Sequence, residues 1–168
     1  MNTGKPVNIR RNIENFGDPY LAASDDSVRV CSGCEAVYWA HRWYLPDRAK
    51  ASGVKTEGKP YAKTLCPACQ KIRDHVPGGV LTVSGGFAEG HKEEILNLIH
   101  NETERAMDVN PLERVMAIEP TKDGFEVTTT NEKLAQRMGR ALHKAYDGIV
   151  TYRWSTDTKL VRVAWHRG

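Results

Sequence analysis

The sequence predicts an α+β protein built in two parts, and two observations support this fold class. Residues 31–69 contain two Cys-x-x-Cys pairs, whereas residues 91–168 alternate between helical and strand periodicities. A chain of 168 residues with 40% hydrophobic and 27% charged residues can bury a core in one domain or two small ones. We therefore expect a mobile arm at residues 1–26, a cysteine module at 27–90 and an α+β domain at 91–168.

Short elements are expected in the first part. Residues 28–30 predict a strand that enters the first cysteine pair, and residues 70–75 predict a helical turn that ends at Pro77 and the two glycines after it. The β-branched residues of 80–83 predict another strand, which we expect to close the cysteine module.

The second part predicts two helices and a small antiparallel sheet. Gly124 ends a turn in which a positive φ is expected, Thr130 stands where a helix N-cap is expected, and Gly148 stands where that helix should stop. The predicted elements are helix 91–106, strands 114–118 and 125–129, helix 131–146, and strands 149–155 and 160–166.

All the cysteines of the chain fall in the two Cys-x-x-Cys pairs: Cys31 with Cys34, and Cys66 with Cys69. Each tight turn points two thiolates at one centre, and two turns complete the tetrahedral four-sulfur coordination that zinc prefers, with bonds of about 2.3 Å. The long spacer adds only loop-closure entropy, which grows slowly with length. We expect one structural zinc ion that contributes folding energy directly.

Other uses of the cysteines stay open. Two disulfides require an oxidising compartment, whereas the absence of an apolar signal or membrane segment predicts a cytoplasmic protein with reduced thiols. A thioredoxin-like site uses one Cys-x-x-Cys pair rather than two, and iron–sulfur clusters usually have other spacings. His75 could replace one thiolate, although a surface or capping role is more common for such a histidine.

Aromatic and basic residues surround the cysteines. Tyr38, Trp39, Trp43 and Tyr44 can form a base-stacking platform or the small core that such a module needs, and we favour the core for the two tryptophans. A basic, glycine-rich loop extends from this cluster and suits phosphate contact, although a solvated loop would look the same. Its candidate phosphate-binding residues are Arg48, Lys50, Lys55, Lys59 and Lys63.

Charge is unevenly distributed, because residues 91–130 hold four basic and nine acidic residues whereas 131–168 hold eight and three. On the second predicted helix, cations at i, i+4, i+7 and i+11 form a stripe whose mutual repulsion a bound polyanion would relieve. In the final hairpin the apolar face should bury Trp154 and Trp165, and the polar face carries two arginines. An ordinary solvated surface is the alternative. The candidate RNA-binding residues are Lys133, Arg137, Arg140, Lys144, Arg153 and Arg162.

The cysteine pairs followed by PGGV and a strand, and then FEVTTTNEKLAQRMGRALHKAYDG with a closing VRVAW strand, resemble the nonsense-mediated mRNA decay protein 3 family. The resemblance covers residues 31–166, and 126–146 is its most distinctive stretch. It implies a zinc ribbon, with the four cysteines at the zinc positions, joined to an α/β module that binds ribosomal RNA or a ribosomal particle. That family usually has more Cys-x-x-Cys pairs and a long tail with transport signals, so nuclear export is not implied.

We therefore expect a non-enzymatic zinc protein that binds RNA on the ribosome or a ribosome precursor. The sequence contains no GxxxxGK[ST], GxGxxG-type, HExxH or GxSxG motif. Two alternatives stay open: a protein partner bound by the acidic helix 91–106 with the cysteine module, and an enzyme that uses an acid from residues 91–130. No membrane partner is expected.

Overall fold

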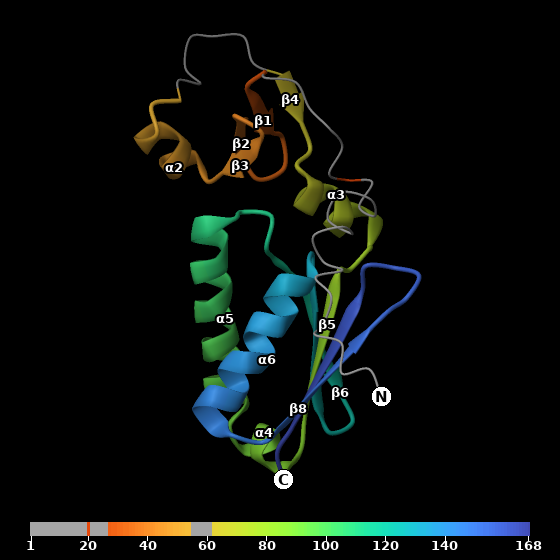
Figure 1. The fold of residues 1–168 in the computed structure, drawn as a ribbon. Coiled ribbons are helices and arrows are strands. Elements are labelled where there is room, and N and C mark those ends of the chain that lie inside the picture. The colour runs from red at the N-terminus through yellow and green to blue at the C-terminus, as the bar shows by residue number, and fades with distance from the viewer. Residues whose placement is uncertain (1–19, 21–26, 55–61) are drawn as a thin grey trace, which may run out of the picture.

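The computed structural model describes Tyr20, residues 27–54 and residues 62–168. They form two β-sheets with helices, which confirms the predicted α+β class, and the smaller sheet lies above the larger unit in Figure 1. The arm expected at residues 1–26 lies, apart from Tyr20, outside the described residues. Lys55 and Lys59 of the predicted basic loop lie outside them as well.

The smaller sheet has the strand order β3-β2-β1-β4. Strand β1 (Arg29–Cys31) pairs antiparallel with β2 (Val37–Trp39) and parallel with β4 (Ala62–Thr64). Strand β2 also pairs antiparallel with β3 (Arg42–Tyr44). Because β1 runs into the first cysteine pair and β4 leads toward the second, their pairing brings the two pairs together.

Two short helices flank this sheet, and with it they form the smaller module. Helix α2 (Pro46–Ala51) begins with a proline, whose fixed φ suits the first turn of a helix. Helix α3 (Pro67–Asp74) begins after Cys66 and ends at His75, which is in the left-handed region at φ 54°. His75 therefore caps a helix and is not one of the clustered cysteine-site residues.

The larger sheet has the strand order β6-β7-β5-β9-β8. Strand β5 is antiparallel to β7 and parallel to β9, so the sheet is mixed, whereas the sequence predicted an antiparallel one. Its strands are β5 (Gly79–Ser84), β6 (Val115–Thr121), β7 (Gly124–Thr129), β8 (Ile149–Trp154) and β9 (Val161–His166).

Strand β5 belongs to the larger sheet, although the sequence predicts the boundary between the two parts after it, at residue 90. That division assigned β5 to the cysteine module, but the strand pairs with β7 and β9 of the larger sheet. Its apolar residues Leu81 and Val83 are buried because the strand has neighbours on both edges and because these side chains face the helices. The partners of β5 are distant in the sequence, so its own residues do not indicate which sheet it joins.

Three helices cover one face of the larger sheet (Figure 1) and form the larger unit with it: α4 (Gly86–Gly90), α5 (Lys92–Val109) and α6 (Glu132–Tyr146). Buried and exposed residues alternate along β9, so one face packs against the helices and the other is exposed. None of the helices in the described part of the chain combines the length and the apolar character needed to cross a membrane. The core includes Leu81, Val83, Ile95, Ile99, Phe125, Val127, Leu134, Met138, Leu142, Val163 and Trp165.

Candidate zinc centre and basic surface

The four cysteine sulfurs lie within 4.8 Å of one another. Cys34 Sγ and Cys66 Sγ are 3.7 Å apart, close to the edge of about 3.8 Å in a tetrahedron with Zn–S bonds of about 2.3 Å. All four thiols are free, and this separation far exceeds the roughly 2.05 Å of a disulfide bond. The predicted site for one structural zinc ion, formed by Cys31, Cys34, Cys66 and Cys69, is therefore confirmed.

Backbone N–H groups in the two tight turns point at the sulfurs. The N–H groups of Gly33 and Cys66 donate to Cys31 Sγ at 3.3 and 3.2 Å, and that of Cys69 donates to Cys66 Sγ at 3.4 Å. Such bonds stabilise thiolates, which are the zinc-binding form. A side chain at position 33 would crowd the site, because its Cβ would lie 3.0 Å from Cys69 Sγ.

Proximity of the thiols shifts their pKa values in opposite directions. The pKa of Cys34 is lowered, mainly because its sulfur accepts a hydrogen bond from the Cys66 thiol. The same contact and burial raise the pKa of Cys66, and burial raises that of Cys69. These shifts favour a thiolate at Cys34 beside protonated thiols at Cys66 and Cys69 when no cation is bound. A bound divalent cation favours release of the remaining thiol protons.

Arg114, from the larger unit, places a positive charge beside the thiolates. Its Nη1 donates to Cys69 Sγ at 3.5 Å, and its Nε donates to the carbonyl oxygen of Pro111 at 2.9 Å. Four thiolates around Zn²⁺ carry a net charge of about −2, which a guanidinium partly neutralises. Sequence reasoning missed Arg114, because nothing in its local sequence relates it to cysteines 45 or more positions away.

Two more arginines, Arg42 on β3 and Arg48 on α2, contact the end of α5. Arg42 Nη2 donates to the carbonyl oxygen of Val109 at 2.7 Å, and the Arg48 guanidinium forms an ion pair with Asp108. The hydrogen bond from Arg48 holds the pKa of the Asp108 carboxyl below its ordinary value. Arg48, predicted to contact phosphate, is thus already engaged by a carboxylate.

The predicted cation stripe on α6 is only partly available to a ligand. Arg137 Nε donates to Glu102 Oε2 of α5 at 2.7 Å, and Arg105 Nη1 contacts the other oxygen of this carboxylate at 3.3 Å. The acidic helix thus uses one of its carboxylates to hold α6. The other three members of the stripe are exposed: Lys133, Arg140 and Lys144.

The aromatic residues of the final hairpin differ in burial. Trp165 is fully buried, as predicted, but Trp154 is 47% exposed and Tyr152 is 40% exposed. The expectation that Trp154 belongs to the core is wrong, because β8 is an edge strand, which only the ladder with β9 borders within the described residues. Helix α6 approaches β8 near Gly139, where a Cβ would lie 3.5 Å from the Tyr152 hydroxyl.

The structure does not gather all the described candidate cations on one surface. Lys50 and Lys63 are exposed on α2 and β4 of the smaller module. Arg153 and Arg162 lie directly opposite each other on β8 and β9, on the sheet face away from the helices. The exposed cations of α6 lie on the helix side of the sheet. Strand β8 therefore separates them from the arginine pair on the other face.

The aromatic cluster of the smaller module is only partly a core. Tyr38 and Trp43 are buried with their ring centroids 5.3 Å apart, which confirms the core interpretation for Trp43. Trp39 is 37% exposed and lies 6.2 Å from the Tyr44 ring, so the same interpretation is wrong for Trp39. Trp39 shares a face with buried Val37, but it is the last residue of β2 and pairs with Arg42 beside the turn, beyond the part of the hairpin that the core covers.

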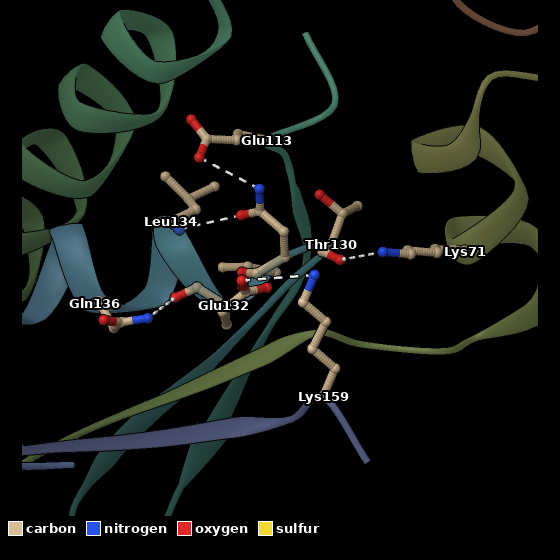
Figure 2. A network of polar contacts seen from close by, with 9 residues as sticks. Lys71, Glu113, Thr130, Glu132, Leu134, Gln136 and Lys159 are labelled. Atoms are coloured by element: carbon tan, nitrogen blue, oxygen red, sulfur yellow. Dashed lines mark hydrogen bonds and ion pairs between the residues drawn. The ribbon is translucent and has the colours of Figure 1, made fainter. Parts of the chain in front are cut away.

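A polar network holds the start of α6 (Figure 2). Asn131 is the N-cap in place of the predicted Thr130: its Oδ1 accepts from the N–H of Leu134 at 3.1 Å, and its Nδ2 donates to Glu113 Oε1 at 3.2 Å. Lys71 Nζ, from α3, donates to the Thr130 carbonyl oxygen at 3.2 Å. The network therefore connects α6 with the helix that carries the second cysteine pair. Burial raises the pKa of Glu113.

No protein-family model matches this chain, and no curated protein matches it.

Proposed function

We propose that this zinc protein binds RNA around the edge strand β8. The observation that carries the proposal is the direct cross-strand pairing of Arg153 with Arg162, both exposed. Like charges directly opposite each other destabilise a sheet. A polyanion on this face would remove the repulsion and release counterions from its own phosphates.

Further cations lie on the helix side of the same strand. Arg140 and Lys144 are exposed on α6, and the neighbouring Gly139 packs close to Tyr152 and Val150 of β8. A nucleic acid that follows β8 would therefore meet positive charge on both sides of the edge. Arg137 and Arg48 are outside this surface, because they form ion pairs with Glu102 and Asp108.

The zinc centre supports a structural rather than a catalytic role for the metal. Four cysteine ligands complete tetrahedral coordination and leave no position for a substrate. The resemblance of residues 126–146 and of the cysteine pairs to the nonsense-mediated mRNA decay protein 3 family favours a ribosomal particle or its precursor as the source of the RNA.

The test is the affinity of the zinc-loaded chain for ribosomal RNA fragments over a series of salt concentrations. The Arg153→Gln/Arg162→Gln variant should bind at least tenfold more weakly, and the slope of log K against log salt should fall by about 1.4–1.8 for two lost phosphate contacts. The matched control, Lys92→Gln/Lys122→Gln, removes two exposed cations from α5 and the β6–β7 turn. Equal affinity and slope for the arginine variant and this control would refute the proposal.

A further inference from the structure

We infer that the RNA on β8 is single-stranded and that its bases stack on Tyr152 and Trp154; this inference rests on the proposed function. The two side chains are two residues apart and therefore point to the same side of the strand. They are 40% and 47% exposed, whereas the residues opposite them, Val163 and Val161, are buried. Two large aromatic side chains thus stand at the rim of the core rather than inside it.

The spacing along the strand leaves room for a base between the two rings. Side chains two residues apart on a strand are separated by about 6.8 Å, roughly twice the stacking distance of about 3.4 Å between bases, so one base fits in a stack between them. Stacking on aromatic rings accepts any base, because every base has a π face. The bases of a duplex already stack on each other and pair, so only an unpaired stretch can place its bases on these rings.

The backbone of Tyr152 also faces this edge. The N–H of Ser155 donates to the Leu160 carbonyl oxygen at 3.0 Å, and hydrogen-bonded pairs alternate along an antiparallel ladder. The next hydrogen-bonded pair is therefore Arg153 with Arg162. The N–H and C=O groups of Tyr152 and Trp154 point away from β9, to an edge where no other strand of the described residues pairs. A base on either ring lies next to these groups.

The two edges of the larger sheet are built differently. Strand β6, at the opposite edge, contains Glu119 and Pro120 and has a bulge between Val115 and Ala117, features that protect an edge from pairing. Strand β8 has none of these and carries one charge, Arg153. The arginines beside β8 and the exposed rings favour a polyanion with planar bases over a peptide strand.

The experiment compares a 12-nucleotide oligouridine with an RNA duplex of the same length, using the zinc-loaded chain and fluorescence anisotropy. Wild type should prefer the single strand at least tenfold, and Tyr152→Ala and Trp154→Ala should each lose about 5- to 150-fold in affinity with little change in salt slope. Trp39→Ala, which removes an exposed tryptophan from the smaller module, should bind like wild type.

Trp154→Phe guards against a folding defect, because it keeps an aromatic ring while it removes the indole fluorophore. It should retain most of the affinity and lose the fluorescence quenching that oligouridine causes in wild type. If the two alanine variants bind as wild type while Arg153→Gln/Arg162→Gln binds weakly, base stacking is overturned and RNA binding stands. If neither set weakens binding, both proposals fail, and equal affinity of wild type for the duplex overturns the single-strand inference alone.

Discussion

Arg114 Nη1 donates a hydrogen bond to Cys69 Sγ at 3.5 Å, so a side chain of the larger unit contacts the zinc centre of the smaller one. The guanidinium stabilises the negative charge of the metal-bound thiolates. Arg114→Gln should therefore lower zinc affinity by about 10- to 100-fold, measured by competition with a chromogenic chelator. Arg114→Lys should recover part of the loss, since it keeps the charge but not the planar fork. A Gln variant with wild-type affinity would contradict this role.

Removal of zinc should unfold the smaller module before the larger unit. The module's core is small and includes Cys31 and Cys66 themselves, whereas the larger unit has its own core of fully buried residues. Hydrogen exchange with a chelator present should accelerate in β1–β3 and α3 and change little in the centre of α6. Added zinc should restore protection. An equal loss of protection in α6 would show that the larger unit also depends on the metal.

Asn131→Ala should lower the free energy of unfolding by about 0.5–2 kcal/mol, because α6 loses its N-cap. The substitution also removes the amide that donates to Glu113 at 3.2 Å. Denaturant unfolding at saturating zinc measures the change. Asn97→Ala is the matched control, an exposed asparagine within α5, and it should not destabilise the protein.

Glu113 should make stability depend on pH. Burial raises its pKa above the ordinary 4.5, so between 4.5 and the raised value the folded state keeps a proton that the unfolded state has lost. The contribution of Glu113 to stability therefore falls as pH rises through this window. Glu113→Gln should gain stability relative to wild type as pH increases from 4 to 7, measured by denaturant unfolding at saturating zinc. A difference that stays constant over this range would contradict the prediction.

Gly124→Ala should destabilise the larger sheet by about 1–3 kcal/mol or more. A Cβ at this position would lie 2.0 Å from the carbonyl oxygen of Val83, which belongs to the backbone of β5 and cannot rotate away. Gly90→Ala is the control, because a Cβ there meets nothing within 4 Å. Thermal unfolding of both variants separates the steric effect from the general effect of replacing glycine.

The parts of the structure that could be predicted are those set by local geometry. Two residues between paired cysteines suffice to aim both sulfurs at one point, so the spacing alone predicts the cluster of Cys31, Cys34, Cys66 and Cys69. The periodicity of residues 131–146 likewise predicted α6 to within one residue at its start.

The remaining features depend on contacts between distant residues. Trp154 lies in a segment whose alternating pattern predicts a half-buried strand. Only the strand order shows that this strand is at an edge of the sheet. Arg48 and Arg137 look like free cations until Asp108 and Glu102 are found beside them. Gly124 was expected to need a positive φ, but it is not among the positive-φ residues and is required by the close approach of β5.

The parallel pairing of β5 with β9 bears on how the chain is made. Gly79 pairs with Val161 and Ser84 with His166, so the first strand of the larger sheet needs the last one to complete its ladder. During translation, β5 leaves the ribosome well before β9 exists, and one edge of its apolar segment stays unpaired until β9 has been made. The nascent chain is therefore exposed to misassembly over this interval, and a chaperone that shields β5 would act on it then.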